Sequence, residues 1–318
     1  LEKRKLRKET IKYMFLLTFE QLVKMFFIML LAIMCYKLKL VTQEGNKSLS
    51  NLLLMVVNPC VILTVYQTDY DPTLVHGLLL AFAAAVAVHI LGIAVSTLLM
   101  RPSSGDDYSI DRYSAMYSNC GFIGIPLISS VLGDSGVFFI TAYMVTFNLF
   151  TFTHGVMLME KKFSLKNLKE GFLSPMFISC IIALLLFFAR IRLPEVLVDS
   201  MNYVADMNTP LAMMIAGFSV AQTDMGKMLK KIRIYYVSAV KLILVPLLVI
   251  PILLLMNLPH DVSLTVLVAA SCPVAATGTM LAIRYKQNYT YASETFAMST
   301  VLSVITIPLV IMFAEQIL

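Results

Sequence analysis

Residues suited to binding chemistry gather at two interruptions of long apolar stretches. The first interruption, SNCGFIGIPLI, occupies residues 118–128, and the second, SCPVAATGTM, occupies residues 271–280. Proline has no N–H to donate and its ring crowds the carbonyl four residues earlier, so Pro126 and Pro273 are expected to break helices. A broken helix inside a hydrophobic region leaves free backbone N–H and C=O groups. We therefore expect both breaks to line a cavity.

The chemistry expected at such breaks is anion binding. A half-helix that starts at a break points its free N–H groups and the positive end of its dipole at the gap. If the two breaks cross, two positive helix ends converge on one small space, which suits a carboxylate. Asn119 offers an amide at the same level. Ser271 and Thr277 add hydroxyl groups, although each can instead bond to its own helix, the commoner role of such residues in membrane spans.

Further residues extend this candidate site. Asn148 is a second amide within an apolar stretch, and its alternative role is a hydrogen bond between helices. Lys241 lies inside another stretch, where it either snorkels to the membrane surface or serves as a counter-charge for a substrate. Cys120 and Cys272 sit beside the breaks, where we favour packing over thiol chemistry. The candidate substrate-binding residues are Asn119, Cys120, Gly121, Ile125, Pro126, Asn148, Lys241, Ser271, Cys272, Pro273 and Thr277.

The elements that position these residues are predicted to be membrane helices. Hydrophobic residues make up 59% and charged residues 14% of the 318 residues, and the mean hydropathy is +0.82, which is outside the usual range of soluble domains. The apolar runs are too long and continuous for the strands of a membrane β-barrel, so the predicted fold class is all-α. Ten transmembrane helices are expected at residues 14–36, 49–67, 74–100, 112–132, 136–159, 172–190, 202–222, 235–256, 262–283 and 291–314.

The loop charges predict the topology. Most loop lysines and arginines follow spans 1, 3, 5, 7 and 9, whereas the loops on the opposite face contain only Arg190 and Arg192. By the positive-inside rule, the basic face is cytoplasmic and both termini are external. The basic stretch EKRKLRK near the amino terminus opposes this assignment, so its placement stays open.

Matched breaks predict an internal repeat. Pro59 of NPC and Pro210 of NTP are 151 residues apart, and Pro126 and Pro273 are 147 residues apart. Each half then contains five helices, and because five is odd, the second half enters the membrane with the opposite orientation. The predicted organisation is a basic tail at 1–13, a first five-helix repeat at 14–160, a cytoplasmic linker at 161–171 and a second repeat at 172–318.

The sequence indicates no enzyme or metal chemistry. It contains no metal-binding histidine pair, nucleophile elbow or phosphate-binding loop, so we expect no catalytic residue, metal or cofactor. The five cysteines are scattered singly, which gives neither a disulfide framework nor the spacing of metal ligands. The net charge of +6 is explained by membrane topology, and no nucleic-acid partner is expected.

The chain resembles the auxin efflux carrier family, which joins plant auxin exporters to bacterial permeases for malate and related acids. The resemblance covers nearly all of the chain except residues 1–13. It is carried by NCGFIGIPL at 119–127, NP at 58–59, NTPLAMMIAGFSV at 208–220, KLILVPLL at 241–248 and STVLSVITIPL at 299–309.

The resemblance implies a secondary active transporter of small organic anions, such as dicarboxylates or auxin-like carboxylates, with elevator-type alternating access. Helices 1, 2, 6 and 7 would form a scaffold, which is expected to make a homodimer. Helices 3–5 and 8–10 would form a transport domain in which helices 4 and 9 cross at their prolines, with Asn119 at the crossing. The expected location is the plasma membrane, with the lipid bilayer as a partner. The short central linker is closer to microbial permeases than to plant exporters.

Two alternatives stay open at this stage. A sodium-coupled organic-anion symporter of the bile-acid type has the same crossed helices. Those symporters share an acidic and an amide side chain that hold sodium at the second break. This chain has Ala275, Ala276 and Thr277 there. A membrane sensor of a metabolite or lipid with the same fold is the alternative from a different class. The sequence does not fix the substrate, the direction of transport or the ion coupling.

Overall fold

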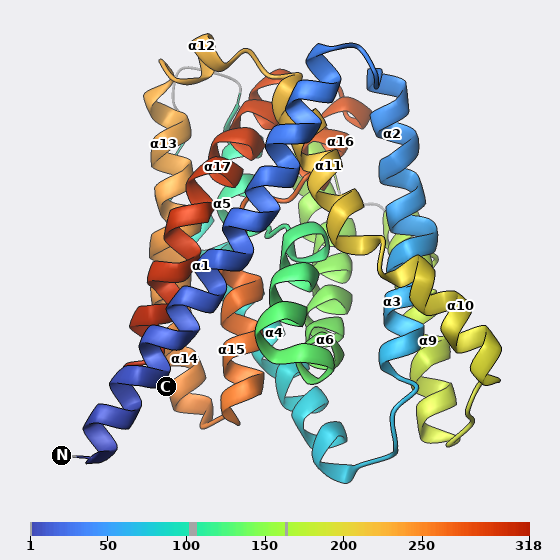
Figure 1. The fold of residues 1–318 in the computed structure, drawn as a ribbon. Coiled ribbons are helices and arrows are strands. Elements are labelled where there is room, and N and C mark those ends of the chain that lie inside the picture. Colours follow the sequence, from blue (N-terminus) through green and yellow to red (C-terminus); the bar gives the residue numbers. More distant parts are fainter. Residues whose placement is uncertain (1, 102–106, 163–164) are drawn as a thin grey trace.

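A computed structural model describes residues 2–101, 107–162 and 165–318. Every regular element within these ranges is a helix, and one isolated β-bridge joins two loops. The prediction of an all-α fold is therefore confirmed. Figure 1 shows the helices side by side, with both termini at the lower end and α12 at the upper end.

The elements include four short π-helical turns, labelled η. In chain order they are α1 (Glu2–Lys37), α2 (Gln43–Leu52), η1 (Leu53–Val57), α3 (Asn58–Val65), α4 (Pro72–Leu99), α5 (Tyr108–Met116), η2 (Cys120–Gly124), α6 (Ile125–Phe150), η3 (Thr151–Gly155), α7 (Val156–Glu160), α8 (Leu165–Phe172), α9 (Pro175–Phe188), α10 (Glu195–Ala205), α11 (Asn208–Ala221), α12 (Met225–Met228), α13 (Ile232–Ala239), η4 (Val240–Leu244), α14 (Val245–Met256), α15 (His260–Ser271), α16 (Thr277–Arg284) and α17 (Tyr289–Ala314).

Seven helical runs in the described ranges are long and apolar enough to cross a membrane. The run from Cys120 to Glu160 has 41 residues and contains a sharp turn at Gly133, where φ is 62°. α9 and α15 are apolar but shorter. The predicted arrangement of several membrane-spanning helices is thus confirmed, whereas their number, ten, stays a prediction. The seven runs are Lys12–Lys37, Gln43–Val65, Pro72–Leu99, Cys120–Glu160, Glu195–Ala221, Ile232–Met256 and Tyr289–Ala314.

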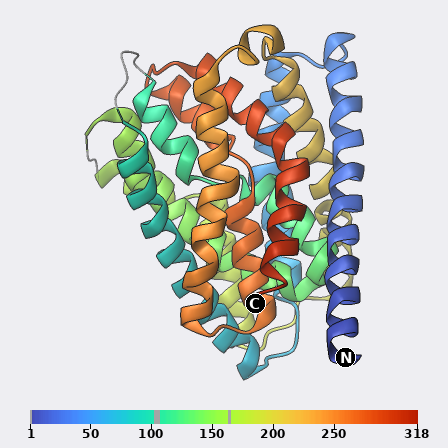
Figure 2. The ribbon, with the colours of Figure 1, turned by 90° about the vertical axis from the view of Figure 1, so that its left-hand side faces the viewer.

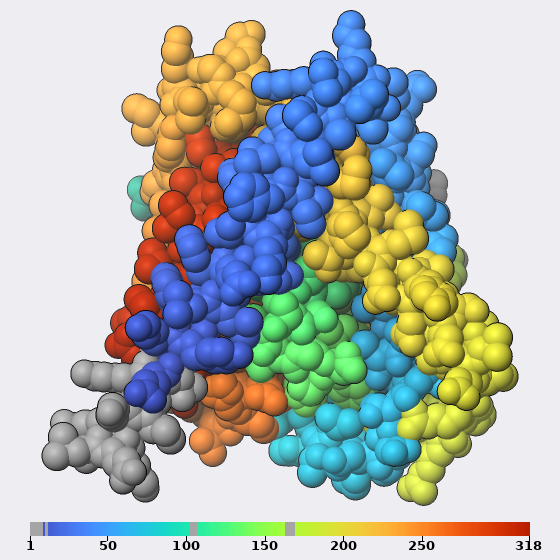
Figure 3. All heavy atoms as spheres, viewed as in Figure 1, coloured from blue at the N-terminus to red at the C-terminus, as the bar shows by residue number. Residues whose placement is uncertain are grey.

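The first helix lies diagonally across one face of the bundle. α1 is continuous from Glu2, so the backbone of the basic amino-terminal stretch belongs to the helix. α1 packs closely on α11, where a Cβ on Gly217 would lie 2.5 Å from the carbonyl oxygen of Met29. Such close backbone approach at small residues is typical of membrane helix pairs. The outer face of α1 exposes Tyr13, Phe27 and Leu31, and Figure 3 shows the helix crossing this side of the molecule.

Prolines explain three of the π-helical turns. A proline lies two residues after the last residue of each of these turns: Pro59 after η1, Pro126 after η2 and Pro246 after η4. Proline cannot complete the normal bond to the carbonyl four residues earlier, and its ring displaces that carbonyl, so the preceding turn widens. The residue before each proline accordingly donates its N–H five residues back, in the pairs Asn58–Leu53, Ile125–Cys120 and Val245–Val240.

A buried ionic cluster joins α5, α13 and α17 near the end of the molecule where α12 lies. The carboxylate of Asp111 accepts hydrogen bonds from Arg233 and from the hydroxyl of Tyr291, the latter over 2.7 Å. Lys231 forms an ion pair with Glu294, which is also buried. These contacts connect three helices that are distant in sequence. Figure 2 shows the same helices stacked together from the side.

Candidate functional site

The two interrupted stretches meet as a short pair of extended segments. Residues 117–119 follow the end of α5, and residues 273–275 follow the end of α15. They pair in antiparallel fashion around a bridge between Ser118 and Val274. The breaks predicted from sequence therefore contact each other, and the paired residues 117–119 and 273–275 are called the crossing. The bonds run from Asn119 N to Pro273 O over 2.7 Å and from Ala275 N to Tyr117 O over 3.0 Å.

The first break lies ahead of its proline. The sequence placed the start of the half-helix near Pro126, whereas the chain becomes helical at Cys120 and Pro126 lies in the first turn of α6. This difference arises because the proline acts on the turn before it, which it widens into η2. Pro273, in contrast, lies in the crossing itself. Ile125 and Pro126 are buried in the first turn of α6.

Lys241 brings a buried positive charge to the crossing. The residue is 0% exposed, and Nζ donates to Ser118 Oγ over 2.6 Å and to Ala270 O over 2.8 Å. Ala270 lies in the last turn of α15, where the negative end of the helix dipole favours a cation. Lys241 therefore does not snorkel to a membrane surface. No carboxylate within the described ranges pairs with it, so the crossing carries a positive charge without a protein counter-ion.

Asn119 follows the residue that Lys241 contacts. Lys241 Nζ donates to Ser118 Oγ, and Asn119, with φ −77° and ψ 54°, leads into the helical turn η2. No hydrogen bond within the described ranges joins the side chains of Asn119 and Lys241. The Nδ2 atom of Asn119 has no hydrogen-bond partner although the residue is buried. This amide donor is free to bind a ligand, and the Lys241 ammonium contacts the preceding residue, Ser118.

A pair of hydrogen-bonded amide side chains joins α3 and α11. Asn208 Nδ2 donates to Asn58 Oδ1 over 2.8 Å, and both side chains are buried. This bond leaves Asn58 Nδ2 and Asn208 Oδ1 without a partner. Buried polar atoms without a partner are costly. The free donor of Asn58 therefore suits a ligand that accepts hydrogen bonds.

Gly121 faces side chains from three other elements. A Cβ on Gly121 would lie 3.8 Å from Asn58 Nδ2, 3.9 Å from Met144 Cε and 4.0 Å from Met176 Cε. Asn148 Nδ2 donates to the sulfur of Met176 over 2.8 Å. The residues around Gly121 thus combine amide donors with flexible thioether chains, which adapt to different apolar shapes.

The remaining candidates have structural contacts. The hydroxyl of Ser271 donates to Leu267 O in its own helix over 2.7 Å, the alternative that the sequence left open. Thr277 bonds to the hydroxyl of Tyr113 over 2.7 Å. Cys120 and Cys272 are both buried, and a Cβ on Gly124 would lie 3.4 Å from Cys120 Cβ and 3.4 Å from Cys272 Sγ. No cluster of three metal-ligating side chains was found in the described part of the chain.

Sequence reasoning did not include Ser118, Asn58 and Asn208 among the site residues. A signal for the last two was present, because they are 150 residues apart, close to the spacing of the paired prolines. Equivalent residues of two repeats meet only near the axis that relates the repeats, so matched amides at this spacing were candidates for contact. Ser118 carried no such signal, since its role depends on the depth of Lys241.

Family comparison agrees with this geometry. The model of a family described as membrane transport proteins matches residues 17–165 and again residues 161–311. The chain belongs to this family of auxin efflux carrier-type membrane transport proteins. No curated protein matches the chain in sequence. The two matches show that this membrane transport protein consists of two repeats, and each repeat contributes one segment of the crossing.

Proposed function

We propose that this membrane transport protein is a secondary active transporter of small organic anions, such as dicarboxylates or auxin-like carboxylates. The observation that carries the proposal is Lys241, a buried cation without a carboxylate partner in the described ranges, which bonds to the residue before Asn119, whose amide donor has no partner. An uncompensated charge in a protein interior is costly. A substrate carboxylate at the crossing would supply the missing negative charge.

The proposed binding mode divides the substrate into two parts. The carboxylate accepts a hydrogen bond from Asn119 Nδ2 and faces the N-terminal end of η2 at Cys120, where backbone N–H groups are unpaired by helix geometry. The body of the substrate lies in front of Gly121, between Met144 and Met176. This binding mode requires one carboxylate on the substrate. The rest of the substrate can be apolar or polar.

The two repeats support alternating access. In two of the contacts between the halves, the partners are separated by a similar number of residues. These contacts are Ser118 with Val274 and Asn58 with Asn208. We propose that ten spans form two inverted five-helix repeats. In this arrangement the transport domain, which includes α5, α13 and α17, moves as one elevator body, and the ionic cluster around Asp111 supports its rigidity.

The proposal extends to assembly and location. We propose a homodimer through the scaffold helices, with α1 at the contact, in the plasma membrane. The exposed apolar residues of α1, Tyr13, Phe27 and Leu31, fit a surface that faces lipid or a second copy. Cross-linking of the purified protein in lipid nanodiscs measures the oligomeric state.

Sodium coupling of the bile-acid type is disfavoured. The ammonium of Lys241 donates hydrogen bonds to Ala270 O and Ser118 Oγ. Sodium would need oxygen atoms of this kind as ligands. We therefore expect uptake without a requirement for sodium. A sensor function would give binding of the anion without movement across a membrane.

Uptake by proteoliposomes tests the proposal. The purified protein is reconstituted, and a panel of radiolabelled mono- and dicarboxylates is offered with and without a proton or sodium gradient. We expect at least one acid to accumulate, and Asn119→Ala to abolish most of that uptake. Lys230→Met, which removes an exposed lysine far from the crossing, is the control and should transport normally. Failure of every acid to enter would refute the carrier function, and binding without entry would favour the sensor.

A further inference from the structure

A second polar pocket lies at the ends of α3 and α9, on the side of the molecule where both chain termini lie. It has a volume of about 370 Å³ and is lined by residues of the last turn of α9 and of the α3–α4 and α9–α10 loops. Its basic side chains are Arg190 and Arg192. They are the only arginines or lysines that the sequence predicts in the loops of this face. Their concentration in one pocket is unexpected on a face that the positive-inside rule otherwise depletes of basic residues.

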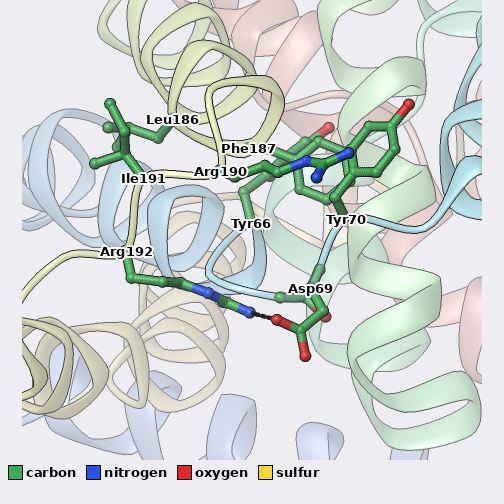
Figure 4. A pocket seen from close by; sticks show the side chains of 9 residues that line it. Tyr66, Asp69, Tyr70, Leu186, Phe187, Arg190, Ile191 and Arg192 are labelled. Carbon is green, nitrogen blue, oxygen red and sulfur yellow. Dashed lines mark hydrogen bonds and ion pairs between the residues drawn. The ribbon is translucent and has the colours of Figure 1, made fainter.

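Arg192 is neutralised, and Arg190 is not. Arg192 Nη2 bonds to Asp69 Oδ1 over 2.5 Å. The guanidinium of Arg190 lies over the ring of Tyr70, 4.9 Å from its centroid, and no carboxylate in the described ranges pairs with it. Figure 4 shows Arg190 reaching across Phe187 and Tyr70, and Arg192 bonded to Asp69 below. The pocket therefore has a net positive charge, with the N–H edge of Arg190 available to an anion.

The surface beside the pocket is apolar over the length of one membrane leaflet. α9 exposes a stripe of large apolar side chains at helical spacing that ends at the pocket. From Ile178 to Phe188 this stripe covers about 15 Å at 1.5 Å per residue, which is about half of the 30 Å hydrocarbon core. The stripe consists of Ile178, Ile181, Ile182, Leu185, Phe188 and, in the loop, Ile191.

From these observations we propose that the pocket binds the phosphate headgroup of an anionic membrane phospholipid, whose acyl chains lie along α9. Guanidinium binds phosphate oxygens through two parallel N–H bonds, and the exposed Tyr70 beside Arg190 is of the residue type that gathers at the membrane interface. A free anion would use the same guanidinium but not the stripe. The stripe therefore favours a lipid over a soluble phosphate. The proposal does not depend on the transport function.

Lipid retention measured by native mass spectrometry tests the proposal. The purified protein in detergent is titrated with phosphatidylglycerol, phosphatidylcholine or glycerol 3-phosphate. We expect phosphatidylglycerol to be retained in preference to the other two, and Arg190→Gln to weaken its binding at least about tenfold, since a charge-assisted bond is lost. Arg190→Lys keeps the charge without the planar fork and should bind with intermediate affinity.

The control is Arg101→Gln, which removes an exposed arginine at the far end of α4 and should leave lipid retention unchanged. Thermal unfolding in lipid-free detergent checks that each variant is folded. Three results would overturn the proposal: equal retention of phosphatidylglycerol by Arg190→Gln and the wild type, equal binding of phosphatidylcholine and phosphatidylglycerol, or displacement of the lipid by glycerol 3-phosphate at comparable concentration.

Discussion

Replacing Lys241 by methionine should separate binding from stability. Methionine keeps a long unbranched chain, so the volume near the crossing changes little, while the ammonium is lost. Ser118 Oγ still donates to Ala270 O, which is 3.1 Å away, so neither polar atom is left without a partner. The variant also removes an unpaired buried charge. We therefore expect its free energy of unfolding to stay within about 1 kcal/mol of the wild type.

The effect on substrate binding should be much larger. The ammonium lies behind the crossing, on the order of 7 Å from a carboxylate held by Asn119, one residue further along the chain. At an effective dielectric constant of about 20, the attraction at that distance is about 2 kcal/mol. Loss of this attraction weakens binding by roughly 30-fold. The measurement is the concentration dependence of uptake in proteoliposomes, beside thermal unfolding in detergent, for the acid that the uptake panel identifies.

Two results would refute this reasoning about Lys241. Unchanged uptake by Lys241→Met would show that the buried charge has no part in anion binding. A large fall in melting temperature together with lost uptake would show that Lys241 is a structural residue. Lys230→Met provides the matched control, because it makes the same chemical change at an exposed position.

Three further predictions concern packing, the free amide and pH. Gly217→Ala should destabilise the protein by about 1–3 kcal/mol in thermal unfolding, because its Cβ would lie 2.5 Å from Met29 O in the contact between α1 and α11; an unchanged melting temperature would refute the close contact. Asn119→Ala should leave the melting temperature unchanged but weaken anion binding, because Asn119 Nδ2 has no protein partner; a strongly destabilised variant would contradict this. Glu315 accepts a hydrogen bond from His260 and raises the pKa of that imidazole, so the pair should stabilise the fold by less than about 1 kcal/mol at pH values below the ordinary pKa of histidine. This contribution should disappear as the pH rises through the raised pKa, and Glu315→Gln should reduce the pH dependence, of which the part due to Asp261 would remain.

Much of the fold followed from sequence because its determinants are local. Apolar runs predicted membrane helices, and the spacing of paired prolines predicted two repeats, which the family match confirms. Contact between the two breaks was only a condition in the reasoning from residues, and the family resemblance implied that helices 4 and 9 cross at their prolines. Residues 117–119 and 273–275 pair in the structure, with Pro273 in the pair and Pro126 outside it. The helices and the repeats depend on hydrophobic length and on the chemistry of proline, both of which can be read directly from the residues.

The depth of Lys241 could not be decided from sequence. Counting along the helix placed it near a membrane surface, and a long side chain can reach that surface by snorkelling. The structure instead directs it inward from η4. Pro246 was a usable signal, because a proline widens the turn before it and shifts the direction of the side chains in that turn. The bond of Ser271 to its own helix likewise depends on a side-chain rotation that sequence does not specify.

A structure with a transported acid bound would test the central claim most directly. We predict density for a carboxylate within hydrogen-bond distance of Asn119 Nδ2, at about 2.7–3.2 Å, with the substrate body in front of Gly121 and between Met144 and Met176. Density for the acid at a separate site, with the amide of Asn119 still unbound, would contradict the claim that the crossing of the two broken helices binds the anion.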